Sequence, residues 1–161
     1  MRLSHYQRSP EGCPRVGNCG GNFSLPLICS MLVPGDSKLL QIRPLDSKVP
    51  IFKQLQADES PVVLLNIFHV AEPDVPALLK AWELDAVWMK RQPGFISTQL
   101  HQAVAGSSVF MNYAVWESIA HFRIAFNNPE FKQSLEQYPP STVASPHLFK
   151  RLSVPNLCVG P

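Results

Sequence analysis

The stretch that decides the fold is Asn112-Tyr113-Ala114-Val115-Trp116-Glu117-Ser118, followed after Ile119 by Ala120-His121-Phe122. It is typical of a strand that ends in a tryptophan and turns directly into a helix capped by Ser118. Upstream, Met89-Lys90-Arg91-Gln92-Pro93-Gly94-Phe95 indicates the opposite boundary, because its Pro-Gly pair ends a helix before a new strand begins. A strand-to-helix and a helix-to-strand boundary so close together leave few folds to consider.

Hydrophobic periodicity supplies the remaining elements. Residues 62–70 form an almost continuous apolar run, as in a strand covered on both faces, and residues 75–89 carry one apolar helical face behind Asp74 as a candidate N-cap. In chain order, the sequence predicts strand 62–70, helix 75–89, strand 95–104, strand 109–116, a helix after Ser118 with a break at Asn127-Asn128-Pro129, and a last strand over 143–154. The order β-α-β-β-α-β is that of a ferredoxin-like α+β sandwich.

The face of this sheet that the helices leave uncovered is predicted to be apolar. Val63, Leu65 and Ile67 alternate along the first strand on the side away from the helices. An apolar sheet face is normally buried against a partner. We therefore expect a homodimer that forms sheet to sheet.

Composition separates the chain into two parts. It has 161 residues, 45% of them hydrophobic, which suits one globular domain with a core, and a net charge of +2, which argues against nucleic-acid binding. The first third of the chain is enriched in glycine and basic residues, and most aromatic residues follow it. The first third therefore has little to bury, and we predict an irregular or disordered extension over 1–57 and a folded domain over 58–157. An organellar transit peptide or an extended translation start, with Met31 as the alternative initiator, would explain the basic extension; we favour the second.

The cysteines and the apolar stretches bear on location and metal binding. Cys13, Cys19, Cys29 and Cys158 form no CxxC pair and have no following histidine at zinc-ligand spacing, so we expect no metal and reduced thiols in a cytoplasmic protein. The apolar stretch 25–33 is too short to span a membrane. No membrane partner is expected.

Residues 60–155 resemble the antibiotic biosynthesis monooxygenase superfamily, whose members are dimeric α+β barrels. The resemblance rests on the strand around Asn66, on the quoted stretches 89–95 and 112–118, and on Asn128-Pro129-Glu130-Phe131. It implies the oxidation of a small aromatic substrate (a phenol, a quinol or a polyketide-like molecule) by O₂ without a bound cofactor. The family also holds haem degraders and proteins of unknown role, so its motifs identify the fold and leave the reaction open.

Oxygen chemistry of this kind needs a dry pocket and hydrogen bonds to a substrate anion. Asn66 is the first catalytic candidate, because an amide within an apolar strand must find a partner; it also aligns with a strand asparagine that functions in haem-degrading members. Asn112 and Trp116 share one strand face, and with Phe68 and Phe122 they are the predicted substrate-binding residues. The structural alternatives are an Asn66 that bridges backbone or a partner chain and a Trp116 that only packs in the core.

His121 is the second catalytic candidate, a base or donor near neutral pH. A helix N-terminus disfavours the imidazolium and would keep it neutral, although a solvent-facing histidine is the plainer alternative. A non-catalytic small-molecule-binding or stress-related dimer would instead fill the pocket with phenylalanines and satisfy Asn66 internally. An isomerase or decarboxylase would need an acid-base pair, for which His121 and Glu117 are the local candidates.

One departure from the family pattern bears on haem. Haem degraders of this superfamily carry a tryptophan on the second helix and a ligating histidine ten residues later. Counted from Trp116, the corresponding positions are Ala125 and Leu135. Haem degradation is therefore not expected, and no cofactor is predicted.

Overall fold

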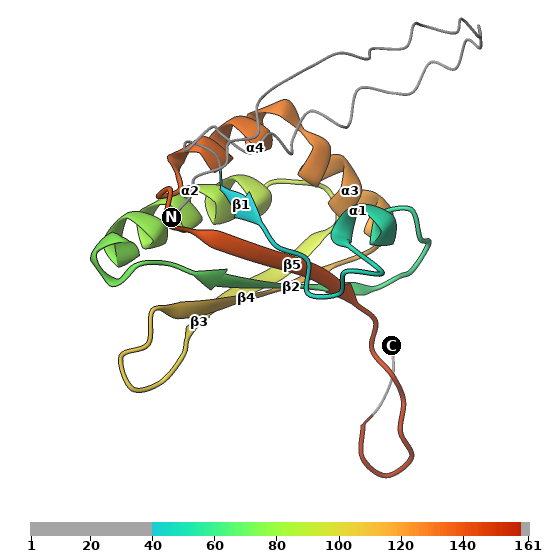
Figure 1. The fold of residues 1–161 in the computed structure, drawn as a ribbon. Coiled ribbons are helices and arrows are strands. Elements are labelled where there is room, and N and C mark those ends of the chain that lie inside the picture. The colour runs from blue at the N-terminus through green and yellow to red at the C-terminus, as the bar shows by residue number, and fades with distance from the viewer. Residues whose placement is uncertain (1–39, 159–161) are drawn as a thin grey trace, which may run out of the picture. The chain divides into compact units, whose positions relative to one another are not determined.

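The computed structural model describes residues 40–158, which belong to one compact unit. The prediction of Met31 as an alternative initiator lies outside the described residues, as does the part of the predicted irregular extension over 1–57 that precedes residue 40. Within the described part, a single sheet carries helices on one face (Figure 1). The mixed α+β ferredoxin-like arrangement predicted from the sequence is confirmed.

The sheet has five strands in the spatial order β1-β5-β2-β4-β3. Their bounds are β1 (Gln41–Ile42), β2 (Val62–His69), β3 (Phe95–Gln102), β4 (Val109–Trp116) and β5 (Val143–Phe149). The central strand β2 pairs antiparallel with β4 on one side and β5 on the other, while β1 runs parallel to β5 at the edge. Strands β3 and β4, both predicted from the sequence, pair antiparallel as a hairpin.

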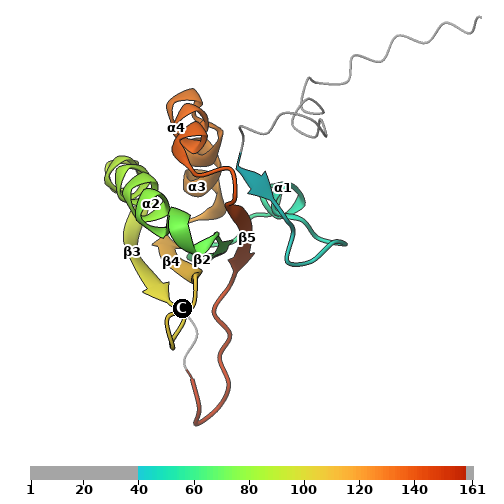
Figure 2. The ribbon, with the colours of Figure 1, turned by 60° about the vertical axis from the view of Figure 1, so that its left-hand side comes forward.

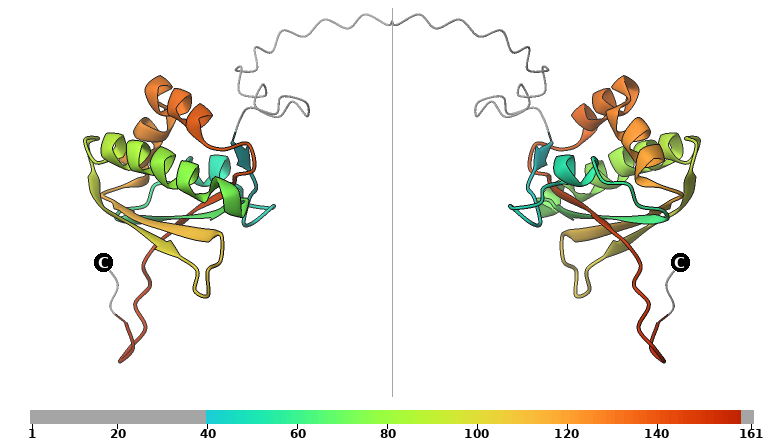
Figure 3. Two further views of the ribbon diagram at one scale, coloured as in Figure 1. Left: turned by 90° about the vertical axis from the view of Figure 1, so that its left-hand side faces the viewer. Right: turned by 90° about the vertical axis from the view of Figure 1, so that its right-hand side faces the viewer.

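The helices cover one face of this sheet and leave the other open (Figures 2 and 3). Their bounds are α1 (Ile51–Gln54), α2 (Val75–Met89), α3 (Ile119–Asn127) and α4 (Pro129–Ser134), with short 3₁₀ turns η2 (Glu72–Asp74) and η3 (Leu135–Gln137). After β5 the described chain continues on the side of the sheet away from the helices (Figure 1). Among residues 40–158, no helix combines the length and apolar character needed to cross a membrane.

The helix boundaries follow from local hydrogen bonding. Ser118 Oγ accepts from the backbone N–H of His121 at 3.2 Å, as predicted for a cap of α3, and Asn128 Oδ1 accepts from the N–H of Glu130 at 2.8 Å to start α4. Gly94 adopts φ +77° after α2, and an added Cβ would collide with the His121 ring. The Asp74 prediction is wrong in detail: its side chain does not cap α2, because it accepts from Ser141 Oγ at 2.6 Å instead.

Two strand predictions also need correction. Strand β5 ends at Phe149, not at Val154, and β3 ends at Gln102, because the chain turns out of the ladder at these points. At the start of β3, the register shift between Phe95 and Ser97 leaves Ile96 53% exposed.

The folded unit extends to the N-terminal side of the expected boundary at 58. Strand β1 hydrogen-bonds to β5, with Arg43 N–H donating to the Ala144 carbonyl at 2.8 Å. Helix α1 buries Ile51 and Leu55 to 2% and 3% exposure in the core around Trp116. Hydrophobic periodicity could not predict β1 or α1, because two and four residues are too few to show a repeating apolar pattern.

Candidate functional site

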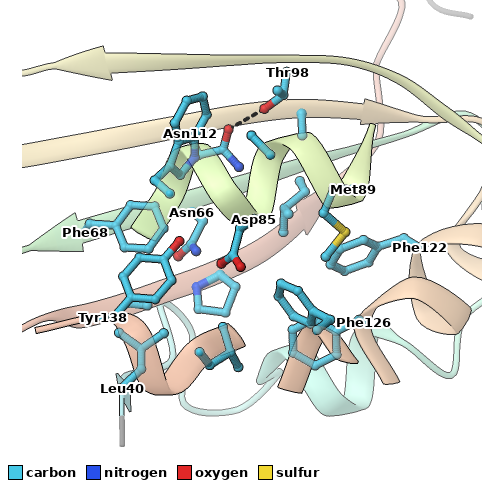
Figure 4. A pocket seen from close by; sticks show the side chains of 18 of the residues that line it. Leu40, Asn66, Phe68, Asp85, Met89, Thr98, Asn112, Phe122, Phe126 and Tyr138 are labelled. Carbon is cyan, nitrogen blue, oxygen red and sulfur yellow. Dashed lines mark hydrogen bonds between the residues drawn. The ribbon is translucent and has the colours of Figure 1, made fainter. Parts of the chain in front are cut away.

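A pocket lies between the covered face of the sheet and the helices (Figure 4). Its cavity volume is about 80 Å³, well above the roughly 10–15 Å³ that one water molecule needs. The polar side chains that line it are Asn66, Asp85, Thr98, Asn112 and Tyr138. The aromatic side chains around them are Phe68, Trp82, Phe95, Trp116, Phe122, Phe126 and Phe131. The pocket is therefore aromatic, with a small set of polar groups.

Two amide side chains lie next to each other on the covered face of the central strands. Asn66 of β2 and Asn112 of β4 are register partners, so their side chains project from neighbouring points of the covered face. Asn112 Oδ1 accepts a hydrogen bond from Thr98 Oγ1 at 2.6 Å, which fixes the orientation of that amide (Figure 4). Asn66 Oδ1 is buried and has no hydrogen-bond partner among the described residues. Such an atom costs about 1–3 kcal/mol of folding free energy.

Trp116 and its neighbours form one aromatic end of the pocket. The Trp116 ring is 1% exposed and meets Phe95 edge-on, with centroids 5.3 Å apart, and Phe122 in a tilted arrangement at 5.4 Å. Phe122 continues the cluster to Phe126 at 5.4 Å. Trp116 Nε1 is also buried without a hydrogen-bond partner in the described part of the chain. Trp116 therefore belongs both to the core and to the pocket wall.

A second aromatic wall stands around Phe68. Its ring stacks on that of Tyr138, with centroids 5.8 Å apart and planes within 10° of parallel. Both rings are buried and both line the pocket. Phe68, Asn66, Asn112, Trp116 and Phe122, five of the six residues singled out from the sequence, thus meet in one cavity.

His121 does not join them. It is absent from the pocket lining, is partly exposed, and its Nδ1 lies 3.1 Å from Ser118 Oγ and 3.6 Å from Glu117 Oε2. The pair of His121 and Glu117 considered for an isomerase does meet, but at the start of α3 and outside the cavity. His121 was predicted from its position at the strand-to-helix boundary. That position places its ring beside Gly94 and not in the pocket.

Asp85 is the residue that the sequence reasoning missed. It lies on α2, is 7% exposed and lines the pocket, and Ser134 Oγ donates a hydrogen bond to its Oδ1. Burial raises the pKa of Asp85 above its ordinary value of 3.8, and hydrogen bonds from Ser134 and Tyr138 lower it in part. A signal was present: Asp85 falls three residues after Trp82 and seven after Leu78, within the apolar stripe of the helix.

Tyr138 is the second group that only the structure brings into the site. Burial, the nearby Asp85 carboxylate and the hydrogen bond between them raise the pKa of Tyr138 well above its ordinary value. The phenol therefore stays protonated at neutral pH and serves as a donor. No Lys, Arg or His lines the described pocket, so Asp85 has no cationic counterpart there.

Neither metal nor haem is suggested by the side chains around this pocket. Within residues 40–158, no three His, Cys, Asp or Glu side chains come together as metal ligands would. Ala125 is buried in the core and Leu135 lines the pocket; these are the two positions that were counted from Trp116 in the sequence.

Comparisons with known proteins agree with this fold and site. A sequence profile of the family described as antibiotic biosynthesis monooxygenase matches residues 61–137. A candidate monooxygenase from Shewanella loihica PV-4 is 31% identical, with a TM-score of 0.51 over 59% of this chain and 97% of that protein. SnoaB, a cofactor-independent oxygenase from Streptomyces nogalater, is 23% identical, with a TM-score of 0.52 over 61% of this chain and 99% of its own. No curated protein matches the sequence.

The fold and the pocket define a ferredoxin-like α+β domain with an aromatic pocket between its sheet and helices. Together with the match over 61–137 and the 31% identical structure, they show that the chain belongs to the antibiotic biosynthesis monooxygenase family. The likeness to SnoaB concerns the fold, given its lower identity. Strand β1 and helix α1 precede the region that the family profile matches.

Proposed function

We propose that this chain is a cofactor-independent monooxygenase that oxidises a small, flat aromatic substrate with O₂. The observation that carries the proposal is the buried Asn66 Oδ1, which has no partner among residues 40–158 and lies in an aromatic pocket. A polar atom kept unsatisfied at a cost to stability is characteristic of functional sites. The aromatic walls suit a planar ligand, since stacked and edge-on rings both gain dispersion energy.

Each side chain has a place in this reaction. Phe68 and Tyr138 on one side, and Trp116 and Phe122 on the other, hold the substrate plane and exclude water. The Nδ2–H groups of Asn66 and Asn112 donate hydrogen bonds to the substrate oxygens and stabilise the anion that forms on deprotonation, while Asn66 Oδ1 accepts from a substrate hydroxyl. That anion reduces O₂; one oxygen atom enters the substrate at a CH₂ carbon, which becomes a carbonyl, and the other leaves as water with the two hydrogens.

The proposal includes a homodimer formed through the open face of the sheet. Val63, Leu65 and Ile67 lie on that face and are only partly buried within one chain. An apolar face of this kind, beside Met111 and Val115 of β4, favours a second copy that packs sheet to sheet. We also propose a cytoplasmic location.

The alternative reading, a non-catalytic small-molecule-binding or stress-related dimer, has less support. It predicted an Asn66 satisfied by its own chain and a cavity filled by Phe68, Phe122 and Phe126. Those rings line the pocket without closing it, and Asn66 Oδ1 has no partner within the described residues. Both observations favour a site that takes a ligand.

Aerobic incubation with a panel of hydroxyanthrones and quinols tests the proposal. Oxygen uptake and the visible absorption of the quinone product would be followed together, and we expect both to depend on the protein. Asn66→Ala should lower turnover by about 100-fold, the size expected for one donor that stabilises a developing oxyanion. Asn127→Ala is the matched control, because Asn127 is exposed and bonds only to the Arg123 carbonyl. Equal turnover in both variants would refute the role of Asn66.

A further inference from the structure

The buried carboxylate of Asp85 is unexplained by packing. It is one of few buried charged or polar side chains in the described chain, and it projects from α2 into the pocket (Figure 4). Helix packing alone would favour an apolar residue at this point of the α2 stripe. Burial of the carboxylate lowers the stability of the folded protein. A functional role for Asp85 would explain why the residue is there.

The groups around Asp85 leave it free to take a proton. Ser134, at the end of α4, donates to Oδ1, and Tyr138, after η3, supplies its hydroxyl. The sheet strands opposite contribute the neutral amides Asn66 and Asn112. Tyr138 is the other titratable side chain of the described pocket lining, and it stays protonated. No neighbouring cation of the lining holds Asp85 in its charged form.

We propose that Asp85 is the catalytic base of this pocket and removes the proton that turns an aromatic ketone or phenol into its reactive anion. This rests on the proposed function only in taking a flat, ionisable aromatic molecule as the ligand. In an anthrone the C–H bond of the ring CH₂ breaks, an O–H bond forms on the Asp85 carboxyl group, and the electron pair passes into the ring system as an enolate. The two amides then face the negative oxygen.

The electrostatics fit this role. A carboxylate whose pKa is raised by burial binds a proton more strongly than one in water, and a base works best when its pKa lies near the working pH. Ser134 and Tyr138 offset part of that rise, so that the group is still able to ionise. The three side chains together set the proton affinity of the base.

Deuterium exchange in the absence of oxygen tests the proposal separately from oxidation. The full-length protein would be mixed anaerobically with 1,8-dihydroxyanthrone in D₂O, and loss of the ring CH₂ signal followed by proton NMR. The wild type should accelerate exchange, and Asp85→Asn should lose about 100-fold or more of that acceleration. Asp74→Asn is the matched control, since it removes a half-buried carboxylate outside the pocket lining that also accepts from a serine, 2.6 Å from Ser141 Oγ. Undiminished exchange in Asp85→Asn, or none in the wild type, overturns the assignment.

A second variant guards against misfolding of Asp85→Asn. Ser134→Ala removes the hydrogen bond that lowers the pKa of Asp85, so the pH at which exchange accelerates should move upward. An unmoved profile would count against Asp85 as the base. Oxygen uptake under air tests the monooxygenase separately. Deuterium exchange without oxygen uptake would support Asp85 as the base and refute the oxygenase. Oxygen uptake that survives in Asp85→Asn would support the oxygenase and refute Asp85 as its base.

An independent observation concerns the wall formed by β1. Leu40 and Ile42 line the pocket, yet they lie before the region 61–137 that the family profile matches. Two backbone hydrogen bonds from this segment, by Gln41 at 3.4 Å and Arg43 at 2.8 Å, hold it against β5. We infer that Ile42 and Leu40 set the size of ligand that this pocket accepts, a specificity that the family domain alone does not encode.

Binding of phenols with one, two and three fused rings tests this second inference. Trp82 and Trp116 line the pocket, so quenching of tryptophan fluorescence reports binding without turnover. Ile42→Ala should raise the affinity for three-ring relative to one-ring phenols by about tenfold, the worth of the methylene groups removed. Gln41→Ala, an exposed neighbour, is the control and should leave the ratio unchanged. An unchanged ratio in Ile42→Ala overturns the inference.

Discussion

The two faces of the sheet use the same strands for different purposes. Along β2, Leu64 and Phe68 point toward the helices and are buried, whereas Leu65 and Ile67 point to the open side and are half-buried. Asn66 lies on the covered face as well and lines the pocket. The pocket therefore occupies space that apolar core side chains would otherwise fill. On the open face Tyr113 and His147 flank Leu65, and the apolar side chains of β2 are those of the proposed dimer interface. A strand with a period of two can therefore carry a site and an interface at once.

The largest effect is expected on the covered face. Trp116→Ala should lower the free energy of unfolding by about 3–5 kcal/mol, because a 1% exposed ring that contacts Phe95 and Phe122 leaves a large cavity. Urea denaturation followed by circular dichroism measures it. Ile96→Ala is the control, since Ile96 is half exposed at the register shift and should cost far less. Equal losses would mean that the core is not centred on Trp116.

The open face is tested by charge. Leu65→Glu should weaken the proposed dimer by about 100-fold or more, because a carboxylate would be desolvated against the second copy without a partner. Sedimentation velocity over a range of concentrations gives the change in mass, and circular dichroism should show an intact fold. Gln133→Glu, which adds the same charge at an exposed position of α4 on the helix side of the sheet, serves as the control. A dimer that survives Leu65→Glu would place the interface elsewhere.

Asn66 and Asn112 should respond in opposite ways to the same change. Asn66→Leu removes a buried acceptor without a partner among the described residues, and should stabilise the fold by about 1 kcal/mol while abolishing turnover. Asn112→Leu deprives Thr98 of its acceptor and should destabilise it by a similar amount. Thermal unfolding of the two variants decides the sign. A loss of stability in Asn66→Leu would indicate that the amide is satisfied in the assembled protein.

The smallest effect is a pH dependence of stability. Because the pKa of Asp85 is raised in the folded protein, the native state binds the proton more tightly than the unfolded chain. The contribution of Asp85 to stability is therefore greatest below its ordinary value of 3.8 and declines as pH rises toward the folded pKa. Asp85→Asn removes this decline, so its stability relative to wild type should increase from about pH 4 to pH 7. Parallel urea titrations at both values measure it, and a constant difference would contradict it.

Part of the site could be found from the chain alone. Asn66 and Asn112 stand out because polar amides interrupt apolar strands, and Trp116 because it ends one. Their meeting follows from antiparallel pairing, which the order of elements already implies. His121 stood out because it begins the helix after the Asn112–Ser118 boundary. Its position is explained by its contacts with Gly94 and with the Ser118 cap.

Asp85, Ser134 and Tyr138 could not be assembled in the same way. They come from α2, α4 and the residue after η3, and sequence spacing does not say which turn of one helix meets another. Likewise, β1 is two residues long, too short for a periodic signal, and its pairing with β5 depends on a contact about a hundred residues away.

The sequence by itself determined the order of elements from β2 to β5, the alternation of these strands between two faces and the boundary from Asn112 to Ser118, because these depend on local periodicity and capping. Only the tertiary structure decided that the covered face encloses a pocket, that Asp85 lies inside it while His121 stays outside, and that β1 forms one wall. Those outcomes depend on how helices pack across the sheet, and packing is set by contacts between residues distant in the chain.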